Sequence, residues 1–181
     1  MIINKLTGIS KKGNAMKAGY TMFCAAMMLA GSCCSHAAGT DTAVLPEHGQ
    51  TIVRSDTQDR FKGADTFFTG DVQITMQFQP TAELPASGAY VTFQKGARTA
   101  WHTHPAGQTL LVVSGKGLTQ EWGKPLVVIE AGDVVRCPAG VKHWHGAAPD
   151  STMTHLAITG ERDGKNVEWL EKVNDRQYAG H

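Results

Sequence analysis

The hydrophobic positions of this 181-residue chain follow the two-residue period of β-strands along much of its length. Val72, Ile74, Met76 and Phe78 alternate with polar residues, which predicts a half-buried strand that ends before Pro80. Many short strands joined by tight turns predict an all-β sandwich or barrel rather than an α/β fold. Further apolar runs bounded by glycine or proline predict strands at residues 90–93, 99–104, 108–114, 118–122, 125–129, 133–137, 142–146 and 153–159.

The two ends of the chain depart from this period. Residues 38–65 are polar and irregular, which predicts a leader or an edge segment. Residues 167–173 (VEWLEKV) place apolar side chains at helical spacing and predict one short C-terminal helix. We therefore expect a single domain over residues 66–181, long enough to bury one hydrophobic core.

The first 37 residues have the composition of an export signal. They contain four lysines and no acidic residue, and residues 18–30 form an apolar run too short to span a bilayer. Small residues precede a cleavage site after Ala37, which predicts a signal peptide over residues 1–37 and a periplasmic protein without a transmembrane span. Translation could start at Met1 or at Met16.

Cysteine usage and charge narrow the class of protein further. Three of the four cysteines lie in the predicted signal, and Cys33 would carry the lipid if the protein were instead a lipoprotein. Only Cys137 remains, so we expect no internal disulfide and a cysteine that packs in a strand rather than a redox thiol. The 13 basic and 16 acidic residues after residue 37 give no indication of a nucleic-acid partner.

Candidate chemistry is concentrated in residues 96–115, GARTAWHTHPAGQTLLVVSG. His102 and His104 are two residues apart, so both imidazoles project from the same face of an extended backbone. Gln108 follows after a Pro-Ala-Gly turn. Three neutral donors on one side of a strand pair predict a divalent metal site, and imidazole with carbonyl ligation suits Mn, Fe, Ni, Co or Zn.

A second run supplies more histidines. Residues 132–143 (GDVVRCPAGVKH) end in His143 after a Pro-x-Gly turn, His145 follows on the same face, and His155 lies in the last expected strand. Five of the eight histidines therefore fall between residues 102 and 155. His145 could contact the substrate, support a neighbouring ligand, or simply bond the backbone at a strand end.

The two runs, G-x5-H-x-H-x3-Q-x6-G and G-x5-P-x-G-x2-H, resemble the two signature motifs of the cupin superfamily. The resemblance covers residues 90–159 and implies a single-domain jelly-roll β-barrel, in agreement with the strand count. Cupins usually carry an acidic residue at the third ligand position, where a neutral glutamine leaves a bound ion its full charge and makes it more Lewis acidic. The metal ligands that the resemblance implies are His102, His104, Gln108 and His143.

Longer stretches resemble the bacterial cupin-type hydroxynitrile lyases, namely GARTAWHTHPAGQTL, GLTQEW, GDVV, KHWHGAAPD and MTHLAI. That group is manganese-dependent and also has glutamine at the position of Gln108. The resemblance implies manganese as the cofactor, His155 as the catalytic acid–base, and a small cyanohydrin that is interconverted with an aldehyde and hydrogen cyanide. The wider resemblance to cupins implies a homo-oligomer, either a dimer or a tetramer.

Two other functions are compatible with the same residues. An iron form of this ligand set would activate dioxygen as a cupin oxygenase, and a non-catalytic periplasmic cupin would use the metal only for structure. A free base such as His155 argues against the second of these. Around the site we expect Val91, Phe93 and Leu110 to form an apolar wall against a small-molecule substrate.

Overall fold

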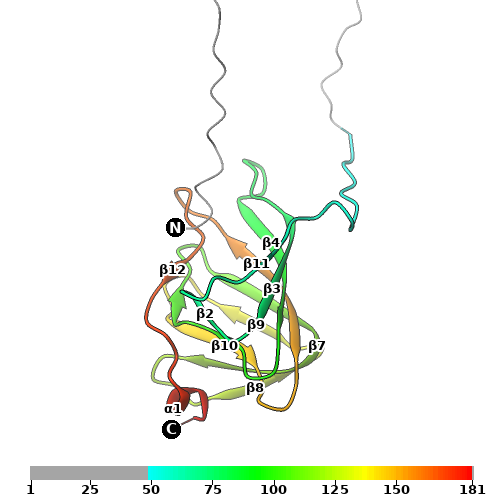
Figure 1. Cartoon of the computed structure of the whole chain (residues 1–181). Helices are drawn as coiled ribbons and strands as arrows, with labels where there is room; N and C mark the ends of the chain where they lie inside the picture. Colours follow the sequence, from blue (N-terminus) through cyan, green and yellow to red (C-terminus); the bar gives the residue numbers. More distant parts are fainter. Residues whose placement is uncertain (1–48, 181) are drawn as a thin grey trace, which may run out of the picture. The chain divides into compact units, whose positions relative to one another are not determined.

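A computed structural model describes residues 49–180 (Figure 1), so the predicted signal peptide of residues 1–37 lies outside the described residues. This part of the chain consists of strands and one short helix, which confirms the all-β prediction. Among the described residues, no helix has the length and apolar character needed to cross a membrane. In chain order the elements are β1 (Arg60–Lys62), β2 (Phe68–Thr69), β3 (Val72–Phe78), β4 (Ala86–Phe93), β5 (Arg98–Thr99), β6 (His102–Thr103), β7 (Gln108–Glu121), β8 (Val127–Glu130), β9 (Val134–Cys137), β10 (His143–Ala147), β11 (Met153–Gly160), β12 (Glu168–Trp169) and α1 (Asp175–Tyr178).

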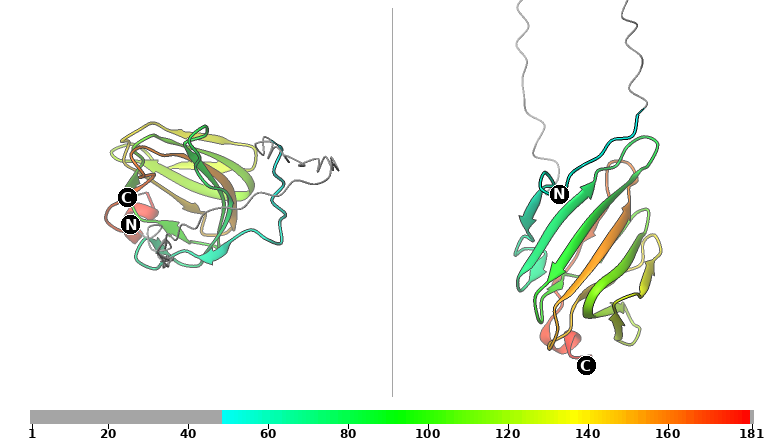
Figure 2. Two further views of the ribbon diagram at one scale, coloured as in Figure 1. Left: turned by 90° about the horizontal axis from the view of Figure 1, so that it is seen from above. Right: turned by 90° about the vertical axis from the view of Figure 1, so that its right-hand side faces the viewer.

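The strands form one antiparallel sheet that curls on itself, in the order β1-β3-β4-β11-β7-β10-β5-β2 (Figure 2). The long strand β7 joins the two halves of the curl, because its first residues pair with β11 and β9 and its later residues pair with β10 and β8. The change of partners falls at Gly115, whose φ of 77° disfavours any other residue. A Cβ atom there would lie 1.9 Å from the carbonyl oxygen of Thr152.

Inward-facing side chains fill the curl with an apolar core. Phe93, Val112 and Met153 are at most 1% exposed and belong to one packed cluster. Burying each of these side chains stabilises the fold by roughly 1.5–3 kcal/mol. Because side chains alternate along a strand, the neighbours Leu111 and Val113 face the outside. The histidines share the inner face with this core.

Most of the predicted strands are present, with ends shifted by a few residues. The alternating segment is β3, which spans residues 72–78. The strands expected at 108–114 and 118–122 are one continuous strand, β7, because the backbone remains extended through the change of partners. Of the expected leader or edge segment of residues 38–65, residues 38–48 lie outside the described residues, and the remainder contributes β1, which pairs with β3 at the edge of the sheet.

The strand expected at residues 99–104 is divided into β5 and β6. Ala100 and Trp101 lie between the two strands, and their backbone N–H groups donate to the carbonyl oxygens of Phe67 and Glu171. These acceptors belong to neighbouring segments outside the ladder that the two strands form with β10. The interruption turns the chain at the start of the histidine pair.

The C-terminal helix is present, but the prediction that it spans residues 167–173 is wrong. That segment is extended, with Glu168–Trp169 paired to β6 and the following residues hydrogen-bonded to the backbone of Trp101. Backbone pairing with the sheet therefore outweighs the helical spacing of its apolar residues. The helix α1 begins after Asn174, whose side chain caps the backbone N–H of Gln177.

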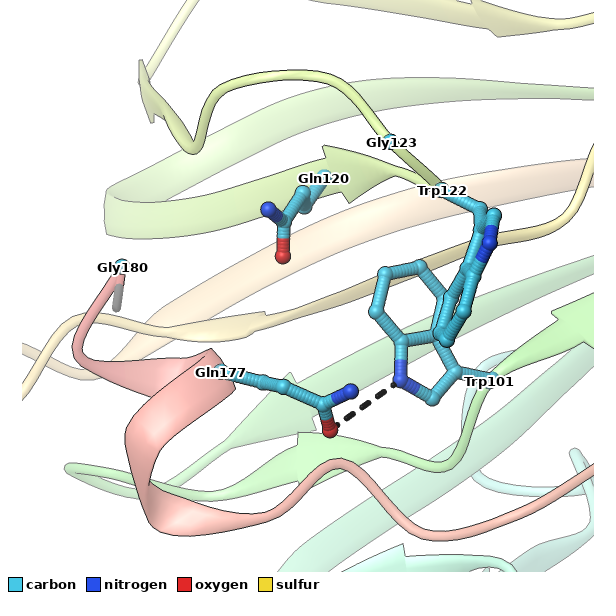
Figure 3. Close-up of a pocket in the computed structure, with 6 residues that line it drawn as sticks. All are labelled: Trp101, Gln120, Trp122, Gly123, Gln177 and Gly180. Carbon is cyan, nitrogen blue, oxygen red and sulfur yellow. Dashed lines mark hydrogen bonds between the residues drawn. The ribbon is translucent and has the colours of Figure 1, made fainter.

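A second apolar cluster packs beneath this helix. The side chain of Gln177 accepts a hydrogen bond from Trp101 Nε1 at 3.4 Å (Figure 3) and ties the helix to the sheet. Trp101 directly precedes His102, and Trp144 lies between His143 and His145, so tryptophans and histidines face opposite sides of the backbone. The cluster comprises Trp101, Leu118, Trp144, Ala148 and Val173.

Candidate metal centre

Three buried imidazoles gather on the inner face of the sheet. His102 on β6 and His143 on β10 are paired residues of adjacent strands, and their ring centroids lie 4.3 Å apart. The ring of His104 lies 5.0 Å from that of His102 and 5.4 Å from that of His143. The fold thus brings together three histidines that the sequence places on two segments forty residues apart.

Each of these rings is held by a backbone carbonyl oxygen. His102 Nδ1 lies 2.9 Å from the oxygen of Ala100, and His143 Nδ1 lies 2.9 Å from that of Val141. A carbonyl oxygen only accepts, so Nδ1 carries the proton and Nε2 keeps its lone pair. This is the arrangement typical of metal-binding histidines.

The third ring, His104, is held from a distant segment. Its Nδ1 lies 2.5 Å from the carbonyl oxygen of Asn166, which belongs to the chain just before β12. The same reasoning assigns the proton to Nδ1 and the lone pair to Nε2. The C-terminal segment is therefore part of the site, although it contributes no ligand side chain.

Several acceptor atoms in this cluster have no hydrogen-bond partner. His104 Nε2, His143 Nε2 and Gln108 Oε1 are all buried and unpaired, a costly state for polar atoms. Gln108 is oriented by Thr159, whose Oγ1 accepts a hydrogen bond from Gln108 Nε2 at 3.0 Å. Buried imidazole nitrogens and an amide oxygen are suitable ligands for a divalent cation, so this donor set fits a metal ion.

Burial keeps these imidazoles neutral. Desolvation lowers the pKa of His104 to about 4, and desolvation together with the neighbouring His143 holds the pKa of His102 well below its usual value. The pKa of His143 is lowered as well, chiefly by burial. Because these pKa values are lowered, the neutral ring is the dominant form at pH 7. The neutral ring is also the form that binds a metal.

His145 and His155 continue the cluster away from these rings. One ring nitrogen from each of His102, His143 and His145 lies within 4.8 Å of the other two, a spacing that could hold a metal ion. His145 Nδ1 also lies 3.2 Å from His155 Nε2, so one proton is shared between the two rings. His145 Nε2 and His155 Nδ1 are buried and have no partner. A hydrogen bond from the His145 ring to the backbone alone was one expected role, and it is not observed, because Nδ1 of this ring contacts His155 Nε2.

Apolar residues flank the two outer histidines. The ring of Phe93 lies 5.8 Å from that of His145 and 5.6 Å from that of His155. Val91 is the cross-strand partner of His155, and Leu110 lies on the same inner face of β7; both are buried. Burial lowers the pKa of His155 to about 4, which leaves a neutral base in apolar surroundings.

Two contributors to the site were not predicted from the sequence. Asn166 acts through its backbone oxygen, and a carbonyl group is present in every residue, so no side-chain pattern reveals it. The inward direction of Thr159 can be predicted from the sequence, because Thr159 and His155 are four residues apart on one strand and so lie on the same face. Only the register of β11 against β7 shows that it faces Gln108.

Two further features lie apart from the histidine cluster. A surface hollow beside α1 is lined by Trp101, Trp122 and the side chain of Gln120 (Figure 3). Gln120 Oε1 accepts from Trp144 Nε1, so its oxygen already serves the packing of the cluster beneath the helix. Cys137 is buried, and burial raises its thiol pKa to about 11, which keeps the thiol protonated.

Comparison with known sequences gives two matches to this chain. The cupin domain family matches residues 89–159, a stretch that contains all five clustered histidines and Gln108. The (R)-mandelonitrile lyase of Granulicella tundricola is 52% identical over 127 residues, which are 70% of this chain and 97% of that protein.

Solved structures have the same architecture. A cupin-like protein from Thermotoga maritima is 43% identical, with a TM-score of 0.62 over 65% of this chain and 89% of its own. A cupin-2 domain protein from Rhodospirillum rubrum is 18% identical, with a TM-score of 0.54 over 72% of this chain and 85% of its own. The second similarity is one of fold alone.

Proposed function

The chain belongs to the cupin superfamily, and we propose that it is a metal-dependent lyase that interconverts a cyanohydrin with an aldehyde and hydrogen cyanide. The related mandelonitrile lyase supports the reaction class. The observation that carries the proposal is the group of buried, unpaired ligand atoms beside a pair of neutral histidines. Such a site joins a place for a cation to a base that can accept a proton.

His102, His104, Gln108 and His143 would hold the metal. We prefer His104 to His145 as a ligand because the carbonyl oxygen of Asn166 fixes the tautomer of His104. The ring of His145 is instead hydrogen-bonded to that of His155, where either nitrogen can carry the proton. The ion, for which we propose Mn²⁺ because the relatives that the sequence resembles use it, supplies Lewis acidity toward a substrate oxygen. Fe, Ni, Co and Zn suit the same donors.

The histidine pair would move the proton. His155, neutral and buried, takes the proton of the cyanohydrin hydroxyl, directly or through His145. The electrons of the O–H bond form the carbonyl, the carbon–carbon bond breaks, and its electron pair leaves with cyanide. The imidazolium then returns the proton to cyanide, so the products are the aldehyde and HCN and the base is restored.

The apolar wall would receive the organic part of the substrate. Phe93, Val91 and Leu110 present no hydrogen-bonding side chains, which favours an aliphatic or aromatic group over a polar one. Removal of such a group from water contributes to binding in proportion to the apolar area that is buried.

The experiment that tests this function combines elemental analysis of the purified protein with a mandelonitrile cleavage assay. We expect one equivalent of a divalent metal, and release of benzaldehyde and cyanide that is lost with a chelator and restored by Mn²⁺. Cleavage that persists without metal would refute the proposal. Turnover that requires iron and consumes dioxygen would instead identify an oxygenase, and bound metal without any turnover would identify a binding protein.

We further propose that the protein is a homo-oligomer assembled through the outer face of the sheet. Tyr90, Leu156, Leu111 and Val134 lie in register across four adjacent strands, β4, β11, β7 and β9. Three of the four are exposed, and an apolar row of this kind on a sheet is suited to a second copy of the same chain.

We also propose export to the periplasm with removal of residues 1–37. The support is the acid-free, lysine-containing start and its apolar run. The intact mass of the protein from a periplasmic extract tests this. A chain that begins near residue 38 supports cleavage, and a lipid-modified chain that begins at Cys33 identifies the lipoprotein alternative.

A further inference from the structure

We infer that Thr159 is a positioning residue for the metal site, because its hydroxyl gives the amide N–H of Gln108 a partner and so leaves the amide oxygen free to face the imidazoles. The inference rests on the proposed function, since it presumes that a divalent cation binds at these histidines. With the amide nitrogen bonded to Thr159, the oxygen of Gln108 is the atom available to bind that cation.

The register of the sheet places the two side chains together. Gln108 is the first residue of β7 and lies directly opposite Thr159 on β11. Both side chains point inward, and Thr159 is only 7% exposed. The distance from Gln108 Nε2 to Thr159 Oγ1 is 3.0 Å, so the amide nitrogen is engaged by Thr159 and the amide oxygen is left free.

The other end of the amide has no partner. With Nε2 bonded to Thr159, the free end of the amide is Oε1, which is buried and has no hydrogen-bond partner. An amide oxygen only accepts, so Oε1 cannot satisfy a neutral imidazole nitrogen that lacks a donor. Nε2 of His104 and Nε2 of His143 are likewise buried and unpaired, so these acceptors and Oε1 all lack a hydrogen-bond donor.

Unpaired acceptors in a buried site need a cation or a donor. A rotation of the amide by half a turn would put Nε2 in place of Oε1, so the site would lose the oxygen ligand that a cation needs. With Thr159 present, the orientation with the oxygen inward costs no unpaired N–H group. Without the hydroxyl, that orientation strands a buried N–H, so metal binding must overcome its loss.

The test is a titration of the metal-stripped, full-length protein with Mn²⁺ in competition with a chelating indicator. For Thr159→Val, which keeps the shape of the side chain, we expect the affinity for Mn²⁺ to fall roughly tenfold to a hundredfold. Thr159→Ser keeps the hydroxyl and should bind within about threefold of the native protein. Should Thr159→Val fail to fold, Thr159→Ala provides the same measurement.

A matched control lies on the same strand. Thr154 also pairs through its hydroxyl, with Thr92 Oγ1 at 2.9 Å, but its side chain is on the other face of β11. Thr154→Val should leave the affinity for Mn²⁺ unchanged. A Thr159→Val variant that binds Mn²⁺ as tightly as the native protein, or a Thr159→Ser variant that binds as weakly as Thr159→Val, overturns the inference.

A double variant separates the amide mechanism from packing. In Gln108→Glu the side chain has no N–H group to strand, and the Thr159 hydroxyl can only donate to the carboxylate, so adding Thr159→Val should weaken Mn²⁺ binding by less than in the native background. An equal loss in both backgrounds would show that Thr159 acts through packing and would refute the inference. If the native protein itself binds no divalent cation, the proposed function is refuted. That outcome is distinct from a native protein that binds Mn²⁺ and is unaffected by Thr159→Val, which refutes only the inference.

Discussion

At the scale of single residues, the site is built from neutral groups. Within residues 49–180 no carboxylate hydrogen-bonds any of the clustered imidazoles; backbone carbonyl oxygens hold three of them. A carboxylate partner would favour the protonated ring, whereas a carbonyl fixes the tautomer and adds no charge. With glutamine as the oxygen donor, a bound cation would keep its full charge, which suits it to polarise a substrate oxygen.

Replacement of His155 by alanine tests its role as the base. We expect kcat for cyanohydrin cleavage to fall by about a hundredfold to ten-thousandfold, because general acid–base catalysis contributes about that much. Metal content should stay at the native level, because the nearest partner of His155 is His145 and not one of the proposed ligands. Steady-state kinetics with metal analysis checks both, and a variant with native kcat contradicts the assignment.

Much of the candidate site follows from the sequence because parity on a strand decides which side chains share a face. His102 and His104 share one by this rule, as do His143 and His145. The contact between His145 and His155 could not be predicted, since it depends on how far apart β10 and β11 lie across the curl. The hydrogen bond from His104 to Asn166 joins residues 62 positions apart through a backbone atom.

At the scale of elements, the strand β7 determines how the two halves of the sheet meet. It carries Gln108 at its start and pairs with β10, which carries His143 and His145, near its end. A strand that serves both halves fixes the distance between them. Alternation of apolar residues predicted the strands. It did not predict that residues 108–114 and 118–122 form one continuous strand, because that depends on pairing with distant parts of the chain.

Gly115→Ala tests the change of partners in β7. We expect it to lower the free energy of unfolding by more than about 3 kcal/mol, because the new Cβ would overlap the Thr152 carbonyl oxygen at a positive φ. Gly123 is a matched control, with φ of 78° and open space around its Cβ position. Gly123→Ala should cost only about 1–2 kcal/mol. Urea denaturation measures both, and equal losses would contradict the steric explanation.

At the scale of the whole molecule, burial of the histidines makes stability depend on pH. Between residues 49 and 180 the folded chain holds five imidazoles whose pKa is lowered, chiefly by burial. Their pKa returns to about 6.5 in the unfolded chain. Below that pH the unfolded state binds protons that the folded state does not accept, so folding is favoured most above pH 6.5.

The metal-stripped protein should therefore lose stability as the pH falls from 6.5 toward 4. His104 and His155, both with a pKa of about 4, set the lower end of this window. Within it each group lowers the free energy of unfolding by about 1.4 kcal/mol per pH unit. Urea denaturation at pH 7, 5.5 and 4.5 in the presence of a chelator measures the slope. His155→Asn should reduce it, and a curve that is flat across the window contradicts the prediction.

The apolar row on the outer face of the sheet carries the prediction for assembly. Leu111 lies in the middle of the row, so Leu111→Lys should convert the oligomer to a monomer by placing a charge in the interface. Ile52→Lys is a control, since this residue is 69% exposed and lies outside the row. Light scattering after size-exclusion chromatography reports the mass. A Leu111→Lys protein that keeps the native mass excludes this face as the interface.

The anchoring of His104 by Asn166 also has a consequence for the order in which the protein assembles. The strands that supply the imidazoles and Gln108 come from residues 102–145, but the acceptor for His104 lies beyond β11, close to the end of the chain. Closing the loop between His104 and Asn166 costs conformational entropy that has to be overcome before the contact can form. We therefore expect the His104 anchor to form after the strands of residues 102–145 have paired, and a metal to bind firmly only once the segment beyond β11 is in place.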